Sequence, residues 1–517
     1  MNSIKKNDLH FPFAFRRNNP YLYHQKHLFK MIKQITGLLC LTASIAFAQT
    51  PPKPYGALPA PRQLAWHETE VYGIMHFTPT TFENKEWGYG DADPKTFNPT
   101  DFNADQIVSA AKAGGLRGIV LVAKHHDGFC LWPTKTTDYN ITKSPFRGGK
   151  GDLVREVADA ARKQGLKFGV YCSPWDRNNA KYGTPEYIKI YREQLRELYT
   201  NYGDLFMSWH DGANGGDGYY GGAREKRSID NTTYYQWDST WTNYTRKLQP
   251  NASIFSDIGW DVRWAGNEDG SVNPTSWATL TPKPSEGQNV AVPGQANATE
   301  NPGGTRGGKF WIPAECDVPL RKGWFYHENE KPKTPEKLFD LYLKSVGRGA
   351  ALDLGLAPDT RGQLHNDDVA VLKTFGDRVK NTFATNLIAR GSSKAVNVRG
   401  YNSIYSAKNL LDGKPDTYWA TDDDFKTPEV VIELSQPIVF DVISLQEYIK
   451  LGQRIEEFAV DAWIGNEWKE IYKGTSVGAK RIARLDVPIT SNKLRLRVTK
   501  SPVSIAISEF GVYKDAE

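Results

Sequence analysis

The chain has 517 residues, and at roughly 150 residues per folding unit this length predicts two or three domains. Aromatic residues make up 12% of the chain although its mean hydropathy is −0.56, so many rings should lie at surfaces or in clefts. The formal net charge of +6 comes entirely from residues 1–50, and the rest of the chain is neutral. This balance argues against a nucleic-acid partner.

The first segment, 1–48, has the pattern of an extension followed by a secretory signal peptide. From Met31 the sequence reads MIKQITGLLCLTASIAFAQT, with a basic start at Lys33, an apolar stretch over 35–47 and a small-residue cleavage site that ends at Ala48. The apolar stretch is too short to cross a membrane. We therefore expect translation to start at Met31, export to the periplasm or the medium, and no membrane-spanning segment.

Three cysteines, Cys130, Cys172 and Cys316, remain after this segment is removed. An odd number cannot close into a disulfide framework, and a chain of this size does not need one. The sequence favours three buried free thiols, with one disulfide and a leftover thiol as the alternative.

Residues 55–387 alternate apolar, strand-like runs with helical patterns. The apolar runs cover 70–77, 118–129, 167–176, 205–212, 253–260, 309–317 and 350–358. Helical patterns cover 100–115, 152–165 and 184–203. This alternation predicts a (β/α)₈-like barrel, with a doubly wound open sheet as the competitor. The absence of a Gly-rich phosphate loop after an early strand disfavours the open sheet.

Polar residues fall at the carboxyl ends of these runs. They are His76, His125, His126, Tyr171, Asp211, Asp257 and Glu315. A barrel brings the carboxyl ends of its strands to one face, so these groups should share one pocket.

The character of the chain changes after the barrel segment. Residues 388–400 are polar and read as a linker, and 401–517 contain short alternating runs separated by turns. This pattern predicts an antiparallel β-sandwich, which makes the chain an α/β barrel followed by a smaller β-domain.

Two carboxylates are candidates for catalysis. Asp211 stands in WHDGANGGDGYY, where glycines after a buried strand allow a substrate to approach, which suits a nucleophile; the alternative is an Asp-Gly turn. Glu268 stands in the turn-rich segment 261–270 after the fifth strand, where a loop over the pocket mouth could carry a proton donor; the alternative is plain solvent surface.

The run KHHDGF, 124–129, places two histidines side by side. Consecutive strand residues point to opposite faces, so His125 and His126 could share a metal only if the strand had already broken. Histidines that hydrogen-bond in a polar pocket are the other interpretation. Trp87 and Trp324 could pack on a sugar face, or could simply pack at the barrel rim.

Together these motifs resemble a known family. YGIMHF, ENKEWG, LVAKHHDGFCLW, GVYCSPWD, WHDGANG, DVRWAGNE and VPLRKGWFYH occur in the order that is typical of glycoside hydrolase family 29 α-L-fucosidases. The likeness covers about residues 60–385. The forms WHDGANG and RWAGNE are similar to the branch that is specific for α-1,3/1,4 linkages.

The resemblance implies a role for each matching residue. Asp211 matches the nucleophile and Glu268 the acid/base of a retaining exo-α-L-fucosidase. The positions that match fucose-binding residues are His76, Glu86, Trp87, His125, His126, Tyr171 and Trp324. The implied reaction needs no cofactor, and the implied partners are fucosylated oligosaccharides or glycoconjugates. Such a mechanism requires the two carboxyls about 5 to 5.5 Å apart, and Glu268 with a raised pKa.

The last domain resembles a discoidin-type carbohydrate-binding module, through SAKNLLDGKPDTYWAT and ISEFGVY. This resemblance implies a structural Ca²⁺, for which Asp412, Thr417 and Glu509 stand at the matching positions and supply oxygen ligands.

Three other functions remain open from the sequence. They are a secreted glycan-binding protein whose barrel has lost activity, an α-L-fucosidase of broad specificity, and a metal-dependent barrel hydrolase.

Overall fold

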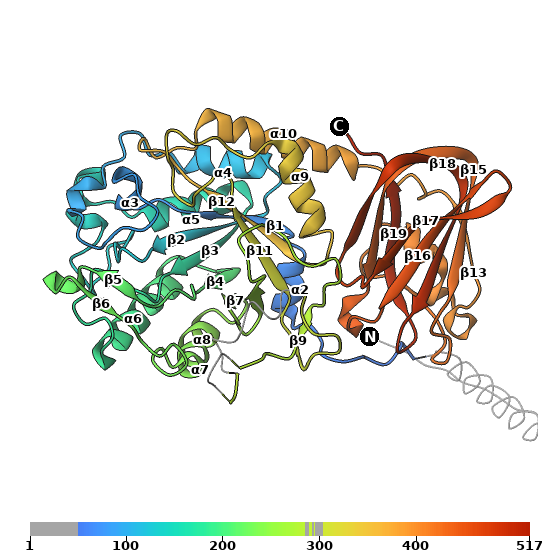
Figure 1. Ribbon diagram of the computed structural model, residues 1–517, viewed down its shortest axis with the longest axis horizontal. Coiled ribbons are helices and arrows are strands. Elements are labelled where there is room, and N and C mark those ends of the chain that lie inside the picture. The colour runs from blue at the N-terminus through green and yellow to red at the C-terminus, as the bar shows by residue number, and fades with distance from the viewer. Residues whose placement is uncertain (1–49, 285–288, 292–293, 295–302) are drawn as a thin grey trace, which may run out of the picture. The chain divides into compact units, whose positions relative to one another are not determined.

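The computed structural model describes residues 50–284, 289–291, 294 and 303–517. Two domains follow one another in the chain, a barrel and then a β-domain (Figure 1). The predicted signal peptide and start site lie outside the described residues.

Eight parallel strands form a closed barrel in the order β1-β12-β11-β8-β7-β4-β3-β2, which confirms the predicted barrel. Their bounds are Val71–Met75 for β1, Gly118–Lys124 for β2, Lys167–Cys172 for β3, Met207–Trp209 for β4, Ser253–Ser256 for β7, Val262–Trp264 for β8, Ala314–Pro319 for β11 and Ala351–Leu356 for β12. All residues of β1 and β2 are buried, because parallel strands are covered on both faces.

One barrel strand lies where the sequence predicted only turns. Residues 262–264 form β8, which pairs with β7 on one side and β11 on the other. Three residues are too few for a run of apolar residues to stand out, and β8 includes the buried Arg263. Glu268 therefore follows the sixth barrel strand rather than a long turn after the fifth.

The longer helices cover the outside of the barrel (Figure 1), and the chain has shorter helices as well. The helices are α2 Pro61–His67, α3 Pro79–Phe82, α4 Ala104–Ala113, α5 Leu153–Gln164, α6 Pro185–Asn201, α7 Trp237–Thr240, α8 Arg246–Leu248, α9 Pro335–Lys344 and α10 Asn366–Thr382. The three predicted helices correspond to α4, α5 and α6. Helix α5 begins at an Asp152 cap and ends at Gly165, whose φ of 79° favours glycine.

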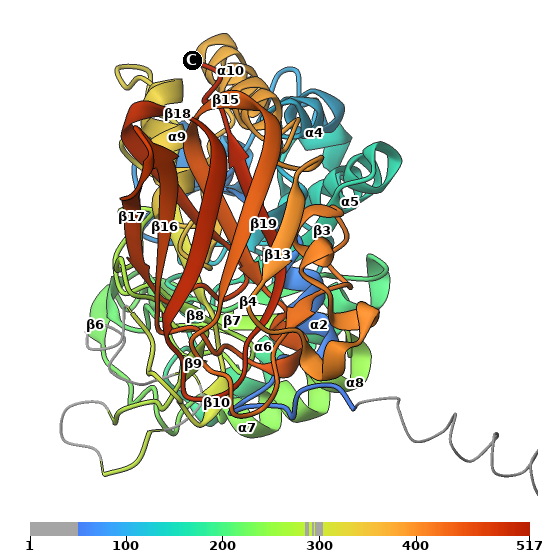
Figure 2. The same cartoon turned by 90° about the vertical axis from the view of Figure 1, so that its right-hand side faces the viewer.

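The second domain is built from antiparallel strands (Figure 2). They are β13 Ser392–Ala395, β14 Trp419–Ala420, β15 Glu429–Glu447, β16 Glu457–Ile464, β17 Glu467–Thr475, β18 Arg481–Lys500 and β19 Ala506–Tyr513. The long strands β15 and β18 pair with each other through register shifts, and their inner face packs a separate hydrophobic core. The segment 388–400, expected to be a linker, contains β13, which pairs with β15.

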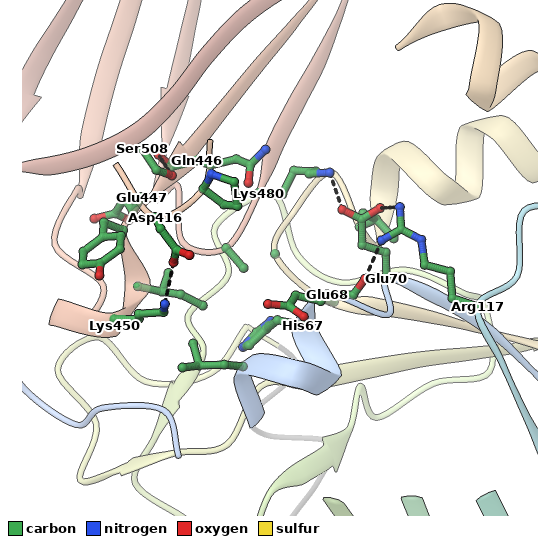
Figure 3. A pocket seen from close by; sticks show the side chains of 18 residues that line it. His67, Glu68, Glu70, Arg117, Asp416, Gln446, Glu447, Lys450, Lys480 and Ser508 are labelled. Atoms are coloured by element: carbon green, nitrogen blue, oxygen red, sulfur yellow. Dashed lines mark hydrogen bonds and ion pairs between the residues drawn. The ribbon is translucent and has the colours of Figure 1, made fainter. Parts of the chain in front are cut away.

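Polar contacts join the two domains on the side of the barrel where its strands begin (Figure 3). Lys480 forms an ion pair with Glu70, and Arg117 lies 3.6 Å from the same carboxylate. Arg481, which is buried, donates from Nη2 to the backbone oxygen of Pro274 at 2.7 Å. A pocket of about 290 Å³ lies beside the Lys480–Glu70 pair.

Two pairs of short antiparallel strands lie outside the barrel and the β-domain sheet. Strand β5 Gly216–Gly218 pairs with β6 Glu225–Arg227, and β9 Thr279–Leu280 pairs with β10 Phe310–Trp311.

Candidate active site

A pocket of about 200 Å³ opens at the carboxyl ends of the barrel strands. Its lining residues are Trp209, Asp211, Gly212, Ala213, Phe255, Asp257, Trp264, Glu268 and Asp317. The two carboxylates singled out from the sequence, Asp211 and Glu268, therefore line the same pocket.

Asp211 lies just beyond β4 and is held by two hydrogen bonds. The Tyr171 hydroxyl donates to Oδ2 at 3.0 Å, and the Ala213 backbone N–H donates to Oδ1 at 2.7 Å. His126 Nε2 lies 3.9 Å from Oδ2. A β-carbon at position 212 would lie 2.2 Å from the Asp257 carboxyl, so a larger residue there would displace the Asp257 side chain. These contacts fix the Asp211 carboxylate in one orientation while it still lines the pocket.

The two adjacent histidines turn into the same site. Strand β2 ends at Lys124 after a register shift, and the rings of His125 and His126 lie 4.1 Å apart. Burial lowers the pKa of both imidazoles, to about 4 for His126, so both are neutral near pH 7. Among the described residues no group of three or more His, Cys, Asp or Glu is arranged to hold a metal ion. His126 Nδ1 lies 2.8 Å from the Ser173 hydroxyl oxygen, within hydrogen-bonding distance.

His76 extends this histidine cluster from the end of β1. Its ring lies 5.4 Å from that of His125 and 5.2 Å from that of Trp324. Burial lowers its pKa to about 3. The Nδ1 atoms of His76 and His125 are buried and have no hydrogen-bond partner among the described residues. Buried polar atoms without partners are rare, and here they point to a polar ligand.

Glu86 is fixed by a loop that comes from much later in the chain. It accepts hydrogen bonds from the backbone N–H of Trp324 at 2.8 Å and of Phe325 at 3.3 Å. His327 Nε2 lies 2.6 Å from Glu86 Oε1, and His327 Nδ1 lies 2.6 Å from Asn84 Oδ1. The contacts of His327 and Phe325 with Glu86 are not predicted from the sequence, although both residues belong to the motif VPLRKGWFYH.

Glu268 is exposed at the pocket mouth, where Trp324 Nε1 donates to its Oε2 at 3.3 Å. Partial desolvation raises its pKa, the Trp324 hydrogen bond opposes this, and the negative charges of Asp211 and Glu86 add to it. Trp87 is 51% exposed and meets the ring of His126 edge-on at 5.2 Å. All nine residues expected in the site are thus linked by direct contacts.

Further carboxyl groups surround the pocket. Asp257 follows β7, and burial together with the charge of Asp211 raises its pKa to about 7. Asp317 Oδ1 accepts a hydrogen bond from Trp264 Nε1 at 2.9 Å. Glu315 was expected to face the pocket, but it is fully buried and accepts from Trp209 Nε1 at 2.8 Å and from Tyr72. Glu315 therefore supports the pocket wall.

A separate cluster of oxygen atoms lies in the β-domain. The Thr417 hydroxyl donates to Asp412 Oδ2 at 2.8 Å. Burial and then the charge of Asp412 raise the pKa of Glu509 to about 7. Glu509 Oε1 is buried and has no partner among the described residues. These side chains offer oxygen atoms, the ligand type that Ca²⁺ takes, but they are not part of any group of three or more His, Cys, Asp or Glu arranged for a metal ion in the described part of the chain.

The three thiols, Cys130, Cys172 and Cys316, are buried and free, as predicted. They make no disulfide and do not line the pocket.

Comparisons with known proteins agree with this arrangement. Residues 55–382 match the family model described as Alpha-L-fucosidase, and residues 389–510 match the model described as F5/8 type C domain. Alpha-L-fucosidase 1 of Arabidopsis thaliana is 37% identical over 492 residues, which cover 94% of each chain.

Solved structures show the same fold. A putative alpha-L-fucosidase from Bacteroides thetaiotaomicron superposes with a TM-score of 0.81 at 35% identity, over 90% of this chain and 99% of that one. A Ruminococcus gnavus GH29 fucosidase in complex with fucose superposes with a TM-score of 0.80 at 31% identity, over 91% and 98% of the two chains. The chain therefore belongs to the α-L-fucosidase family of glycoside hydrolases, family 29, and carries an F5/8 type C domain after its catalytic barrel.

Proposed function

We propose that the protein is a retaining exo-α-L-fucosidase that removes terminal α-1,3/1,4-linked L-fucose from glycans. The observation that carries this proposal is the pairing of Asp211, held by two donors, with Glu268, whose pKa is raised, in one pocket. Two carboxyl groups with different environments are what a two-step glycosidase needs.

In the first step Asp211 attacks the anomeric carbon while Glu268 gives its proton to the leaving oxygen. The C–O bond to the leaving sugar breaks as the ester between Asp211 and fucose forms. In the second step Glu268, now ionised, takes a proton from water. The water oxygen attacks the anomeric carbon from the face that the leaving sugar vacated, and the bond between that carbon and the Asp211 carboxylate breaks. Two inversions give α-L-fucose, and the mechanism requires carboxyls about 5 to 5.5 Å apart.

Neutral imidazoles suit the recognition of sugar hydroxyls, since each ring offers one donor and one acceptor. The unpartnered Nδ1 atoms of His76 and His125 supply this capacity, and Trp87 offers an exposed ring face. The preference for α-1,3/1,4 linkages rests on the motif forms WHDGANG and RWAGNE. A broad-specificity enzyme would also release α-1,2- and α-1,6-linked fucose from a panel of oligosaccharides.

Substitution of the two carboxyls tests the proposed roles. We expect Asp211→Asn to lower kcat on an aryl α-L-fucoside by at least about 10³-fold. Glu268→Gln should lower kcat about 10² to 10⁴-fold on an oligosaccharide, because its leaving group needs a proton. The same variant should lower kcat much less on the activated aryl substrate. Asp217→Asn, at an exposed carboxylate on strand β5, is the matched control and should keep full activity. Wild-type turnover by Asp211→Asn would contradict the proposal, and an inactive wild type would favour a glycan-binding protein.

We also propose that the protein is exported, to the periplasm or the medium, since the sequence from Met31 has the features of a signal peptide. Within the described ranges no helix is long and apolar enough to cross a membrane. The proposed partners are fucosylated oligosaccharides or glycoconjugates. For the β-domain we propose glycan binding and a structural Ca²⁺ held by Asp412, Thr417 and Glu509.

A further inference from the structure

Asp257 has hydrogen-bonding capacity that the protein does not use. Its carboxyl is half-buried, lines the catalytic pocket and forms no hydrogen bond or ion pair with any described residue. Removing a carboxyl group from water costs free energy unless a hydrogen-bond partner compensates for the lost hydration. The Asp257 carboxyl is therefore available to hydrogen-bond a molecule that enters the pocket.

The order of strands places Asp257 on the leaving-group side of the site. Strand β7, which carries Asp257, lies between β4, which precedes Asp211, and β8, which precedes Glu268. The histidine cluster and Tyr171 lie at the ends of β1, β2 and β3, in the other half of the barrel. Glu268 must reach the oxygen between fucose and the next sugar, so the pocket wall that it shares with Asp257 faces that next sugar.

The same wall offers an aromatic surface. Trp264 is half-buried and lines the pocket, and the hydrogen bond from its Nε1 to Asp317 Oδ1 at 2.9 Å fixes its ring. A fixed indole is a suitable surface for the apolar face of a sugar ring. Asp257 and Trp264 thus provide a polar and an apolar contact for one sugar unit.

The chemistry of Asp257 suits a hydroxyl group. Burial first, and the charge of Asp211 second, raise its pKa to about 7, so near neutral pH much of it is protonated. A protonated carboxyl donates one hydrogen bond and accepts others, which matches the donor and acceptor of a sugar hydroxyl. The carboxyls that line the pocket with it are Asp211, Glu268 and Asp317.

We propose that Asp257 hydrogen-bonds a hydroxyl of the leaving sugar and thereby selects carbohydrate leaving groups. This proposal rests on the proposed fucosidase function and adds a specificity-determining residue to it. Asp257 contacts the substrate next to the scissile bond, and no step of the bond exchange passes through it.

The test compares two substrates that differ only in the leaving group. One is a fucosylated oligosaccharide with an α-1,3/1,4 linkage, and the other is α-L-fucosyl fluoride, whose leaving group is too small to reach Asp257. For Asp257→Ala we expect kcat/KM to fall about 10- to 100-fold on the oligosaccharide, the effect of one lost hydrogen bond, and less than about 3-fold on the fluoride. Asp257→Asn keeps the shape of the side chain, so its kcat/KM on the oligosaccharide should fall less than that of Asp257→Ala.

Asp269→Asn, on the exposed loop beside Glu268, is the matched control and should leave kcat/KM unchanged on both substrates. Equal losses on both substrates would overturn the proposal, because Asp257 would then act through Asp211 or the fold. Unchanged kinetics on the oligosaccharide would overturn it as well. Turnover of the fluoride by the variant shows that it is folded. Failure of the wild type on the fluoride would instead contradict the proposed fucosidase function, so the two failures are distinguishable.

Discussion

Asp211 and Glu268 differ in their surroundings, and this difference supports their assigned roles. The Tyr171 hydroxyl and the Ala213 backbone N–H stabilise negative charge on Asp211, which favours a nucleophile. Glu268 is partly desolvated and near two other carboxylates, which favours the protonated form that a general acid needs. The sequence predicts that Tyr171 and Asp211 share one pocket, but it does not predict that the Tyr171 hydroxyl donates to the Asp211 carboxylate, because the order of strands alone does not fix side-chain contacts.

The hydrogen bond from Trp324 to Glu268 gives a prediction about pH. The indole N–H stabilises the ionised form of Glu268, so Trp324→Phe should raise the pKa of Glu268 further. The acid must be protonated to act, and kcat/KM therefore falls as pH rises through that pKa. We expect the basic limb of the profile of kcat/KM against pH, measured on an oligosaccharide, to move to higher pH.

Trp324 is expected to contact fucose, so Trp324→Phe also changes the absolute value of kcat/KM. The pH at which the basic limb falls is therefore the quantity that tests the role of Glu268. Trp468→Phe, on β17 of the β-domain, is the control and should leave the profile unchanged. A basic limb that stays in place or moves to lower pH in Trp324→Phe would be inconsistent with the role of Glu268.

At the scale of elements, long periodic segments were predictable and short ones were not. Helices α4, α5 and α6 follow from apolar spacing and from caps such as Asp152. Strand β8, with three residues, has no such signal and emerges only from pairing with β7 and β11. The break of β2 after Lys124, which brings His125 and His126 together, also depends on pairing with β3.

The loops of the β-domain yield a prediction about metal removal. If Asp412, Thr417 and Glu509 hold Ca²⁺, the ion compensates the charges of two neighbouring carboxylates, and its removal should destabilise the fold. We expect a chelator to lower the Tm of the wild type by several degrees, and added calcium to restore it. Because Glu509 must be ionised to bind, the effect of calcium should grow as pH rises through about 7.

Asp412→Ala should have a lower Tm that responds to neither chelator nor calcium. Asp424→Ala removes an exposed carboxylate from the same domain and should behave as the wild type. A wild-type Tm that is insensitive to both reagents would argue against a calcium site.

At the scale of the whole molecule, the sequence predicts the order and type of the two domains, and the motifs predict which residues meet. It does not predict contacts between distant loops. Glu86 and His327 are 241 positions apart and meet only because both loops lie at the same face of the closed barrel. The joining of the domains through Lys480 and Glu70 has no local signal in the sequence either.

The most direct test of the central claim is to trap the fucosyl-enzyme. A 2-deoxy-2-fluoro-α-L-fucosyl fluoride forms a covalent ester with a retaining enzyme. Water hydrolyses this ester slowly, because the fluorine at C2 destabilises the oxocarbenium-like transition state of the second step. Mass spectrometry of the digested protein should then find one fluorofucosyl group, on the peptide that contains Asp211, and none in Asp211→Asn. A label on another carboxylate, or steady hydrolysis without any labelled peptide, would contradict Asp211 as the nucleophile.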